Sequence, residues 1–143
     1  RILFSAGLDL LPQFGALVTN GQEELSALTY LISMRWAQAN REITAELGAY
    51  YETRLRSLQS RSPDMIPAIE GTRHLCGLAF ADPAQGKRFV RHLMERGLDI
   101  SMQTYKSDCP PVVLTKLPLI ADQPVIDHVT AAMEEALQAI CLE

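Results

Sequence analysis

Apolar residues recur every three or four positions from Gly21 to Arg61, with Glu, Gln and Arg between them. This spacing predicts one long amphipathic helix or two consecutive helices. A glycine costs about 1 kcal/mol inside a helix, so we expect a break or kink at Gly48. Ser62-Pro63 ends the helix, because the residue before a proline is pushed out of the helical region. The apolar row consists of Leu25, Leu28, Ile32, Trp36, Ala39, Ile43, Leu47, Tyr51, Leu55 and Leu58.

The segment from His74 to Ala81 is largely apolar at both alternating sets of positions, which predicts a strand covered on both faces. A helix should begin directly after it, since Asp82 is a good capping residue and Pro83 suits the first helical position. Gly97 stands where a left-handed residue would close this helix. A short strand is expected from Leu98 to Met102.

The last third of the chain adds one strand and one helix. PVVLTKLPL, residues 111–119, predicts a strand with a proline near each end, which limits its pairing partners. Asp122 caps the final helix, with Pro124 in its first turn. The resulting order of helix, strand, helix, strand, strand, helix predicts an α+β fold. We expect a short, mainly antiparallel sheet with helices packed on one side, preceded by the long helix.

The chain of 143 residues suits one domain with a real core. Residues 1–20 show no sustained hydrophobic periodicity and are interpreted as a connector or lone strand from a large domain that lies upstream. Residues 21–61 are interpreted as a long linking helix region. Residues 62–143 are interpreted as a small α+β domain. The chain opens at Arg1 without an initiator methionine or the pattern of a secretory or transit segment. We therefore expect a piece of a longer protein.

Composition argues against several classes of protein. Hydrophobic residues make up 48% and charged residues 21%, as in soluble globular domains. The net charge of -4 and the scattered arginines argue against a nucleic-acid partner. No apolar run approaches the roughly 20 residues of a membrane helix. Three widely spaced cysteines, Cys76, Cys109 and Cys141, fit a reducing, cytoplasmic setting better than a disulfide framework.

Two groups of residues are candidates for chemistry. His74 and Cys76 would share one face of a strand, so an imidazole and a thiol could meet. The structural interpretation is stronger, because free cysteine is among the most buried residue types. No cysteine or histidine spacing indicates a zinc site. A lysine beside a proline at a strand end, such as Lys116, is usually an exposed charge unless a carboxylate or phosphate makes it a ligand.

Four stretches follow one another in a characteristic order: EGTRHLCGLAFAD, ERGLDI, VVLTKLPL and PVIDHVTAAMEEAL. Together they resemble the carboxyl-terminal end of the class III aminotransferases, which depend on pyridoxal phosphate. The resemblance covers about residues 21–141. The matching positions are Gly71, Arg73, Gly77, Gly97-Leu98, Leu117-Pro118-Leu119 and Ile126-Asp127.

The resemblance implies an intact homodimeric enzyme that moves an amino group between an amine or amino acid and an oxo acid. This chain would supply the small domain that closes over the substrate. In that family a lysine attaches covalently to the cofactor, and it lies upstream of the segment that begins here. No lysine precedes Lys87 in this sequence. The isolated chain should therefore be inactive and is not expected to bind pyridoxal phosphate alone.

Two binding residues follow from the resemblance. The family places a threonine that reaches the cofactor phosphate of the neighbouring subunit near residue 19, and Thr19 lies one residue out of register, where Val18 stands. Many members bind the substrate carboxylate through an arginine at the position of Leu114. Here Lys116, two residues further on the same face of the strand, would serve as a point-charge substitute. The amino donor and acceptor stay open.

A rival hypothesis is a stand-alone, non-catalytic dimerisation or regulatory module. The apolar row from Leu25 to Leu58 would then be exposed in the monomer and would need a partner. A metal- or thiol-based enzyme is a more distant alternative.

Overall fold

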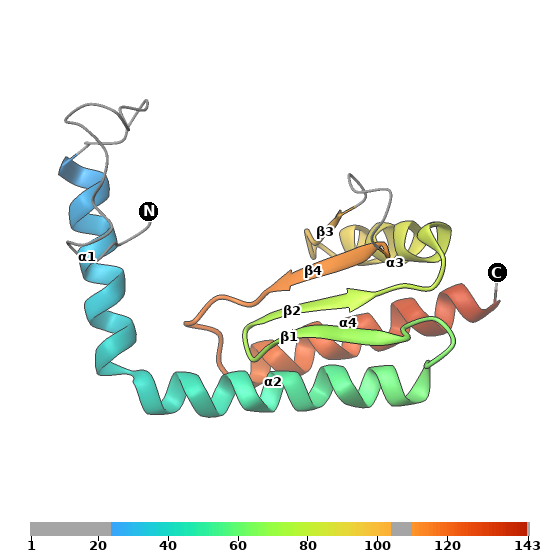
Figure 1. Cartoon of the computed structure of the whole chain (residues 1–143), viewed down its shortest axis with the longest axis horizontal. Helices are drawn as coiled ribbons and strands as arrows, with labels where there is room; N and C mark the ends of the chain where they lie inside the picture. Colours follow the sequence, from blue (N-terminus) through green and yellow to red (C-terminus); the bar gives the residue numbers. More distant parts are fainter. Residues whose placement is uncertain (1–23, 104–109, 143) are drawn as a thin grey trace, which may run out of the picture. The chain divides into compact units, whose positions relative to one another are not determined.

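The structure, a computed structural model, describes residues 24–103 and 110–142. The chain divides into two compact units, Arg1–Ala39 and Asn40–Glu143. The described part of the first unit contains helix α1 (Glu24–Ala39). The second unit contains, in chain order, α2 (Arg41–Arg61), β1 (Ala68–Thr72), β2 (Leu75–Ala79), α3 (Pro83–Glu95), β3 (Ser101–Gln103), β4 (Val112–Lys116) and α4 (Gln123–Leu142) (Figure 1).

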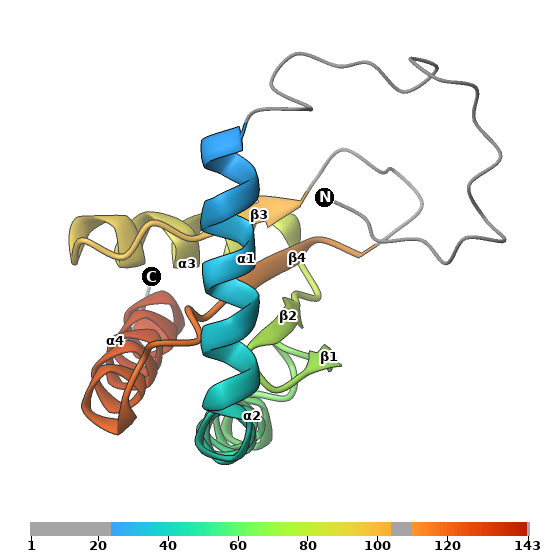
Figure 2. The same cartoon turned by 90° about the vertical axis from the view of Figure 1, so that its left-hand side faces the viewer.

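The strands form one antiparallel sheet in the order β1-β2-β4-β3. Cys76 of the inner strand β2 lies opposite Gly71 of β1 on one side and opposite Thr115 of β4 on the other. Helices α2, α3 and α4 pack on the same side of this sheet (Figure 2). The α+β fold with helices on one side of an antiparallel sheet is therefore confirmed.

The hydrophobic core lies between the sheet and these three helices. It contains Tyr51, Leu55 and Leu58 from α2. Its two buried phenylalanine rings, Phe80 and Phe89, lie with their centroids 5.2 Å apart, within the range in which aromatic pairs attract each other. Among the described residues, every member of the core belongs to the second unit. The other large, fully buried aliphatic side chains are Ile66, Leu78, Leu93, Val113, Ile126 and Met133.

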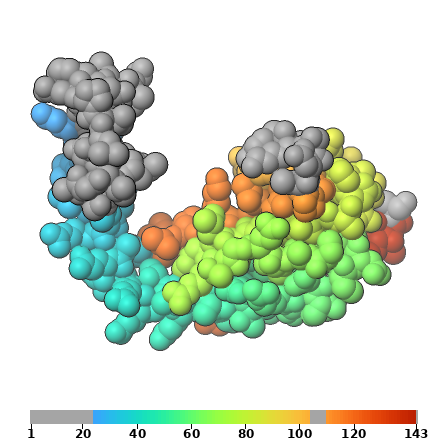
Figure 3. All heavy atoms as spheres, in the orientation of Figure 1, coloured from blue at the N-terminus to red at the C-terminus, as the bar shows by residue number. Residues whose placement is uncertain are grey.

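The opposite face of the sheet is partly exposed. In Figure 3 the yellow-green atoms of β1 and β2 and the orange atoms of β4 are visible beside the green atoms of α2. Leu75 is 61% exposed, whereas Cys76, Leu78 and Phe80, at the alternate positions, are buried on the helix side. Gly77 and Ala79, at the same set of positions as Leu75, are also buried, so β2 is covered on both faces except at Leu75, close to what its sequence predicted.

Both predicted helix starts in the second unit are present. The N–H of Ala84 donates to Oδ1 of Asp82 at 2.9 Å, and Pro83 occupies the first position of α3. The N–H of Val125 donates to Oδ1 of Asp122 at 3.1 Å. At the far end of α3, Gly97 has φ +78°, the left-handed conformation that glycine adopts without strain.

The expected break at Gly48 is wrong. The helical region is interrupted at Asn40, and Gly48 lies inside the continuous helix α2. A Cβ atom at Gly48 would lie 2.6 Å from Nδ1 of His74 and 2.8 Å from Cβ of Arg73. The glycine is needed because the turn between β1 and β2 packs directly on the helix backbone.

The strand β1 was not predicted. It is an edge strand that follows Pro67, and only its first two residues, Ala68 and Ile69, are partly buried. Its sequence AIEGT therefore lacks the alternation that marks a half-buried strand. A second difference concerns the short strand β3. It begins at Ser101, three residues later than the strand predicted from Leu98.

The described part of the first unit shows a different pattern of exposure. Helix α1 buries none of its residues. The first half of the predicted apolar row is therefore exposed, whereas Tyr51, Leu55 and Leu58 at its end are buried in the core of the second unit. The most exposed members are Leu25, Leu28 and Ile32, at 70%, 53% and 59%.

Candidate functional site

A cleft of about 220 Å³ lies where β4 ends and the chain approaches β3. Its walls come from four parts of the second unit: α2, the segment 98–101, the segment 114–118 and α4. Leu98, Ile100 and Leu117 give it apolar sides. Small-molecule sites commonly combine such apolar walls with a few polar groups, and this cleft carries two charged residues as well.

Two buried polar residues, Tyr51 and Thr115, also line the cleft. The hydroxyl of Thr115 donates to the carbonyl oxygen of Cys76 at 2.8 Å and so ties β4 to β2. Burial raises the pKa of Tyr51 to about 12. The tyrosine is therefore neutral at physiological pH, and neither residue brings a charge to the cleft.

The charged residues of the cleft are Lys116 and Asp99, and both are exposed. Lys116 is the last residue of β4 and pairs with Leu75 of β2. On the other side of β4, Ser101 lies opposite Leu114. Asp99 lies two residues before the first residue of β3, and it shares with Lys116 only the lining of this cleft. Within residues 24–103 and 110–142, neither side chain makes a hydrogen bond or ion pair.

The turn between β1 and β2 is a second cluster of polar groups. Arg73 has φ 54°, an uncommon conformation for a residue with a side chain. Its backbone N–H donates to Oε2 of Glu52 at 2.9 Å, while Nη2 of Arg56 donates to Oε1 at 2.7 Å. These hydrogen bonds, the backbone one first, lower the pKa of Glu52. The carboxylate thereby anchors a strained turn to α2.

His74 and Cys76 both belong to this turn and the strand that follows it. The thiol of Cys76 donates to the carbonyl oxygen of Arg73 at 3.2 Å, and burial raises its pKa. Burial, followed by the charge of Arg73, lowers the pKa of His74. A thiol that stays protonated is a poor nucleophile. These facts agree with the structural interpretation of the pair.

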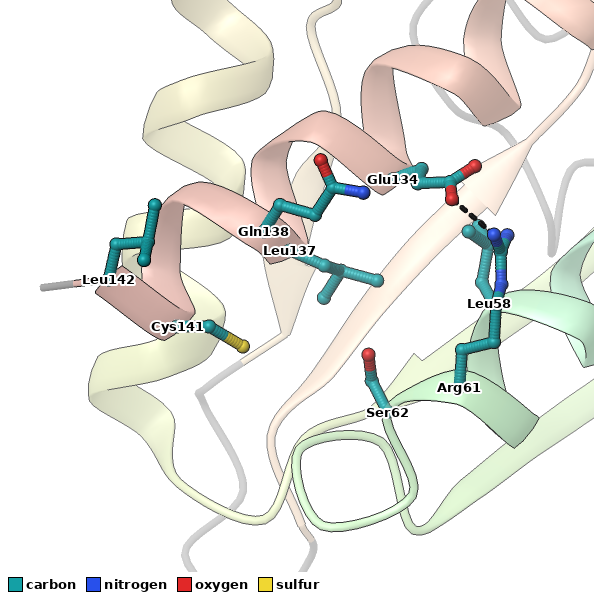
Figure 4. A pocket seen from close by; sticks show the side chains of 8 residues that line it. All are labelled: Leu58, Arg61, Ser62, Glu134, Leu137, Gln138, Cys141 and Leu142. Carbon is teal, nitrogen blue, oxygen red and sulfur yellow. Dashed lines mark hydrogen bonds and ion pairs between the residues drawn. The ribbon is translucent and has the colours of Figure 1, made fainter.

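A wider groove of about 390 Å³ lies between the carboxyl-terminal ends of α2 and α4 (Figure 4). Arg61 and Glu134 form an ion pair across it, and Leu58 and Leu137 supply apolar lining. The exposed thiol of Cys141 is at the other end. Its two charges already neutralise each other, so this groove offers less to a charged ligand than the cleft at β4 does.

The structure bears differently on the two predicted binding residues. Lys116 lines the β4 cleft. Thr19 lies outside the described residues. Asp99 was missed, because its sequence context shows only a charge after Gly97-Leu98, and only the folded chain brings it to the same cleft as Lys116.

Two other expectations concern metals and membranes. In the part of the chain that the structure describes, no group of three or more His, Cys, Asp or Glu residues could hold a metal ion. None of the helices in that part has the length and apolar character needed to cross a bilayer.

Solved structures resemble this chain, although no protein-family model matches the sequence and no curated protein matches it. A lysine aminotransferase from M. tuberculosis, in the internal aldimine form, superimposes with a TM-score of 0.64 at 21% identity. The match covers 77% of this chain and 24% of that one. A Bacillus anthracis aminotransferase gives a TM-score of 0.62 at 17% identity, with 76% and 27% covered. This chain has the fold of a part of the aminotransferases.

The fold by itself does not select one reaction. A phospholyase from Arthrobacter, in complex with phosphoethanolamine, gives a TM-score of 0.65 at 21% identity. That match covers 76% of this chain and 27% of the phospholyase. The chain thus spans about a quarter of the length of the proteins it resembles, and they include enzymes with different activities.

Proposed function

We propose that this chain is the small carboxyl-terminal domain, with its leading helix, of a class III aminotransferase that depends on pyridoxal phosphate. The intact enzyme would transfer an amino group between an amine or amino acid and an oxo acid. The observation that carries the proposal is the fold match to aminotransferases over about three quarters of the chain. The ordered motifs from EGTRHLCGLAFAD to PVIDHVTAAMEEAL support it independently.

The described residues do not fit a site for the cofactor. Their two lysines, Lys87 on α3 and Lys116 on β4, are both exposed, and a lysine that binds a carbonyl cofactor covalently needs a depressed pKa from burial or a neighbouring cation. In the proposed enzyme the pyridoxal phosphate, which serves as an electron sink, is held by other residues. The share of this chain is to bind and orient the substrate.

We assign the substrate carboxylate to Lys116. An ammonium group attracts a carboxylate as a point charge, and the attraction is stronger beside apolar walls than in open water. Both conditions are met in the β4 cleft, where the ammonium has no other partner among the described residues.

The test uses the intact protein with pyridoxal phosphate bound. Lys116→Ala should raise the KM for a carboxylate-bearing substrate about tenfold, the loss of one charge-assisted hydrogen bond of about 1.4 kcal/mol. The absorbance of the bound cofactor should not change. Lys87→Ala is the matched control, because it removes an exposed lysine outside the cleft. An unchanged KM in Lys116→Ala would refute the assignment.

We also propose that the enzyme is a cytoplasmic homodimer. The odd number of cysteines and the buried, unpaired Cys76 support a reducing compartment. Light scattering of the intact protein tests the assembly, and a mass equal to one subunit would contradict the dimer.

The exposed face of α1 favours a second candidate, a stand-alone, non-catalytic dimerisation module. Large apolar side chains at Leu25, Leu28, Leu31 and Ile32 are at least half exposed, and such a row generally marks a contact surface. The intact mass of the natural gene product separates the two candidates. A product several times larger than 15.9 kDa that binds pyridoxal phosphate supports the aminotransferase. A product of this size that self-associates without the cofactor supports the module.

A further inference from the structure

Helix α1 carries an exposed row of large apolar side chains on one face. Leu25, Leu28 and Ile32 follow one another at intervals of three and four residues and are 70%, 53% and 59% exposed. Residues at this spacing share one face of a helix, and the same spacing forms the contact line of a two-stranded coiled coil. The described part of the chain buries none of these side chains, so the row is available to another molecule.

The two charged residues of α1 indicate which molecule fits this row. Glu24 begins the helix, and Arg35 lies eleven residues later, about three turns further along and three residues after Ile32. Both are exposed, and neither makes a hydrogen bond or ion pair with a described residue. The row therefore has an anion at one end and a cation at the other. A second copy of the same helix, running in the opposite direction, presents the complementary order of charges.

The apolar residues and the charges specify the same antiparallel register. If Leu28 of one copy lies level with Ile32 of the other, then Leu25 lies level with Arg35 of the other copy. Glu24 is then about 1.5 Å from that level along the axis, within reach of the guanidinium, while the Arg35 stem packs on Leu25. In a parallel pair the two Arg35 side chains would meet at one level and repel each other.

We propose that α1 pairs in antiparallel orientation with α1 of a second copy of this chain, and that ion pairs between Glu24 and Arg35 flank the apolar contact. This inference rests on the second candidate function and deepens it, because it names the surface and the geometry of the dimerisation module. The contact uses the same surface on both copies, so it closes at two subunits. It also supplies the packing that a short helix needs in water.

The first experiment follows the mass and the tryptophan emission of the 143-residue chain as its concentration rises. Trp36 is the only tryptophan of the sequence and lies on α1, so its emission reports on this helix. We expect a dimer in sedimentation equilibrium, with a shift of the emission to shorter wavelength. Leu28→Glu should raise the dimer Kd about tenfold or more, because it places a charge in the apolar contact. Ala27→Glu, at an exposed position outside the row, is the control and should leave the Kd unchanged.

The second experiment tests the orientation by reversing the charges. Glu24→Arg and Arg35→Glu should each raise the dimer Kd about fivefold or more, because each replaces two attractive pairs by two repulsive ones. The double variant Glu24→Arg/Arg35→Glu should bind more tightly than either single variant, since it forms both pairs again with the charges exchanged. In a parallel pair the double variant would still place like charges opposite each other at position 35. The main thermal transition should be the same in all variants, because the described core lies within residues 40–143.

The outcomes separate this inference from the proposed functions. If the chain dimerises equally well after Leu28→Glu and after both charge reversals, it associates through another surface, and the inference is wrong while the module stands. A double variant that binds no more tightly than the single ones would refute the antiparallel orientation. A chain that stays monomeric at every concentration overturns the inference and the module together. It leaves the aminotransferase standing, because that function is tested by the binding of pyridoxal phosphate to the intact protein.

Discussion

At the scale of single residues, Gly48 shows how one position can be misjudged from sequence. Its lack of a side chain suggests a weak point of the helix, but the turn at Arg73 and His74 uses the space that a Cβ would fill. The close packing of the turn on α2 offsets the low helix propensity of glycine at this position. Local propensity is a weak guide wherever a tertiary contact requires one residue type.

Gly48→Ala should therefore destabilise the protein, although alanine is the better helix former. We expect a net loss of about 1 kcal/mol, since overpacking typically costs about 1–3 kcal/mol, or about 2 kcal/mol at mid-range, and the helix gains about 1 kcal/mol. The nearby Cβ of Arg73 is attached to the backbone and cannot move aside alone. Urea denaturation measures the change. Ser57→Ala, at an exposed position of α2, is the control and should have little effect. Equal or higher stability of Gly48→Ala would contradict the close packing.

A second residue-scale prediction concerns pH. Glu52 has a lowered pKa in the folded protein, so its ionised form stabilises the fold above its ordinary pKa of about 4.3. This stabilisation is lost as the pH falls through the lower, folded-state pKa. Glu52→Gln should therefore be less stable than wild type at pH 7, and the difference should shrink as the pH falls from about 5 to 3. Thermal unfolding at several pH values tests this. Glu46→Gln, an exposed glutamate on the same helix, should show no such convergence.

At the scale of elements, sequence signals were reliable where a local interaction defines a boundary. Asp82 and Asp122 accept hydrogen bonds from the first turns of α3 and α4, as their positions before Pro83 and near Pro124 indicated. Strand β1 lacked such a signal. It gains its structure from pairing with β2, and its own sequence shows neither alternation nor an apolar run.

The cap of α3 can be tested by removing its carboxylate. Asp82→Ala should lower the free energy of unfolding by about 1 kcal/mol, because the N–H of Ala84 loses its acceptor. Asp82→Asn should retain most of the stability, since asparagine is an equally good capping residue. Chemical denaturation provides both values. If the two variants lose the same amount, the charge near the helix terminus, and not the hydrogen bond, would be the main contribution.

At the scale of the whole molecule, the two compact units differ in what holds them together. The unit Asn40–Glu143 contains every core residue that the structure describes, whereas the described part of the other unit, α1, buries no side chain. A short helix without tertiary packing is marginal in water. The second unit therefore has the features of an independent folding unit.

A protein comprising residues 40–143 should accordingly unfold in one cooperative transition. Its Tm should equal that of the main transition of the 143-residue chain within a few degrees, because every core residue among those that the structure describes lies within residues 40–143. Circular dichroism during heating measures both. A gradual, non-cooperative loss of helix in residues 40–143 would mean that the first unit contributes to the core.

The sequence by itself determined the fold class, the helical character of residues 41–61, and the helices α3 and α4 with their capping residues, because these depend on periodicity and on hydrogen bonds between near neighbours. It also indicated Lys116, through a resemblance and its place on a strand. Only the tertiary structure decided the role of Gly48, the existence of β1 and the position of Asp99 in the same cleft as Lys116. Each of these depends on which residues meet after the sheet has formed, and local propensities carry no information about such contacts.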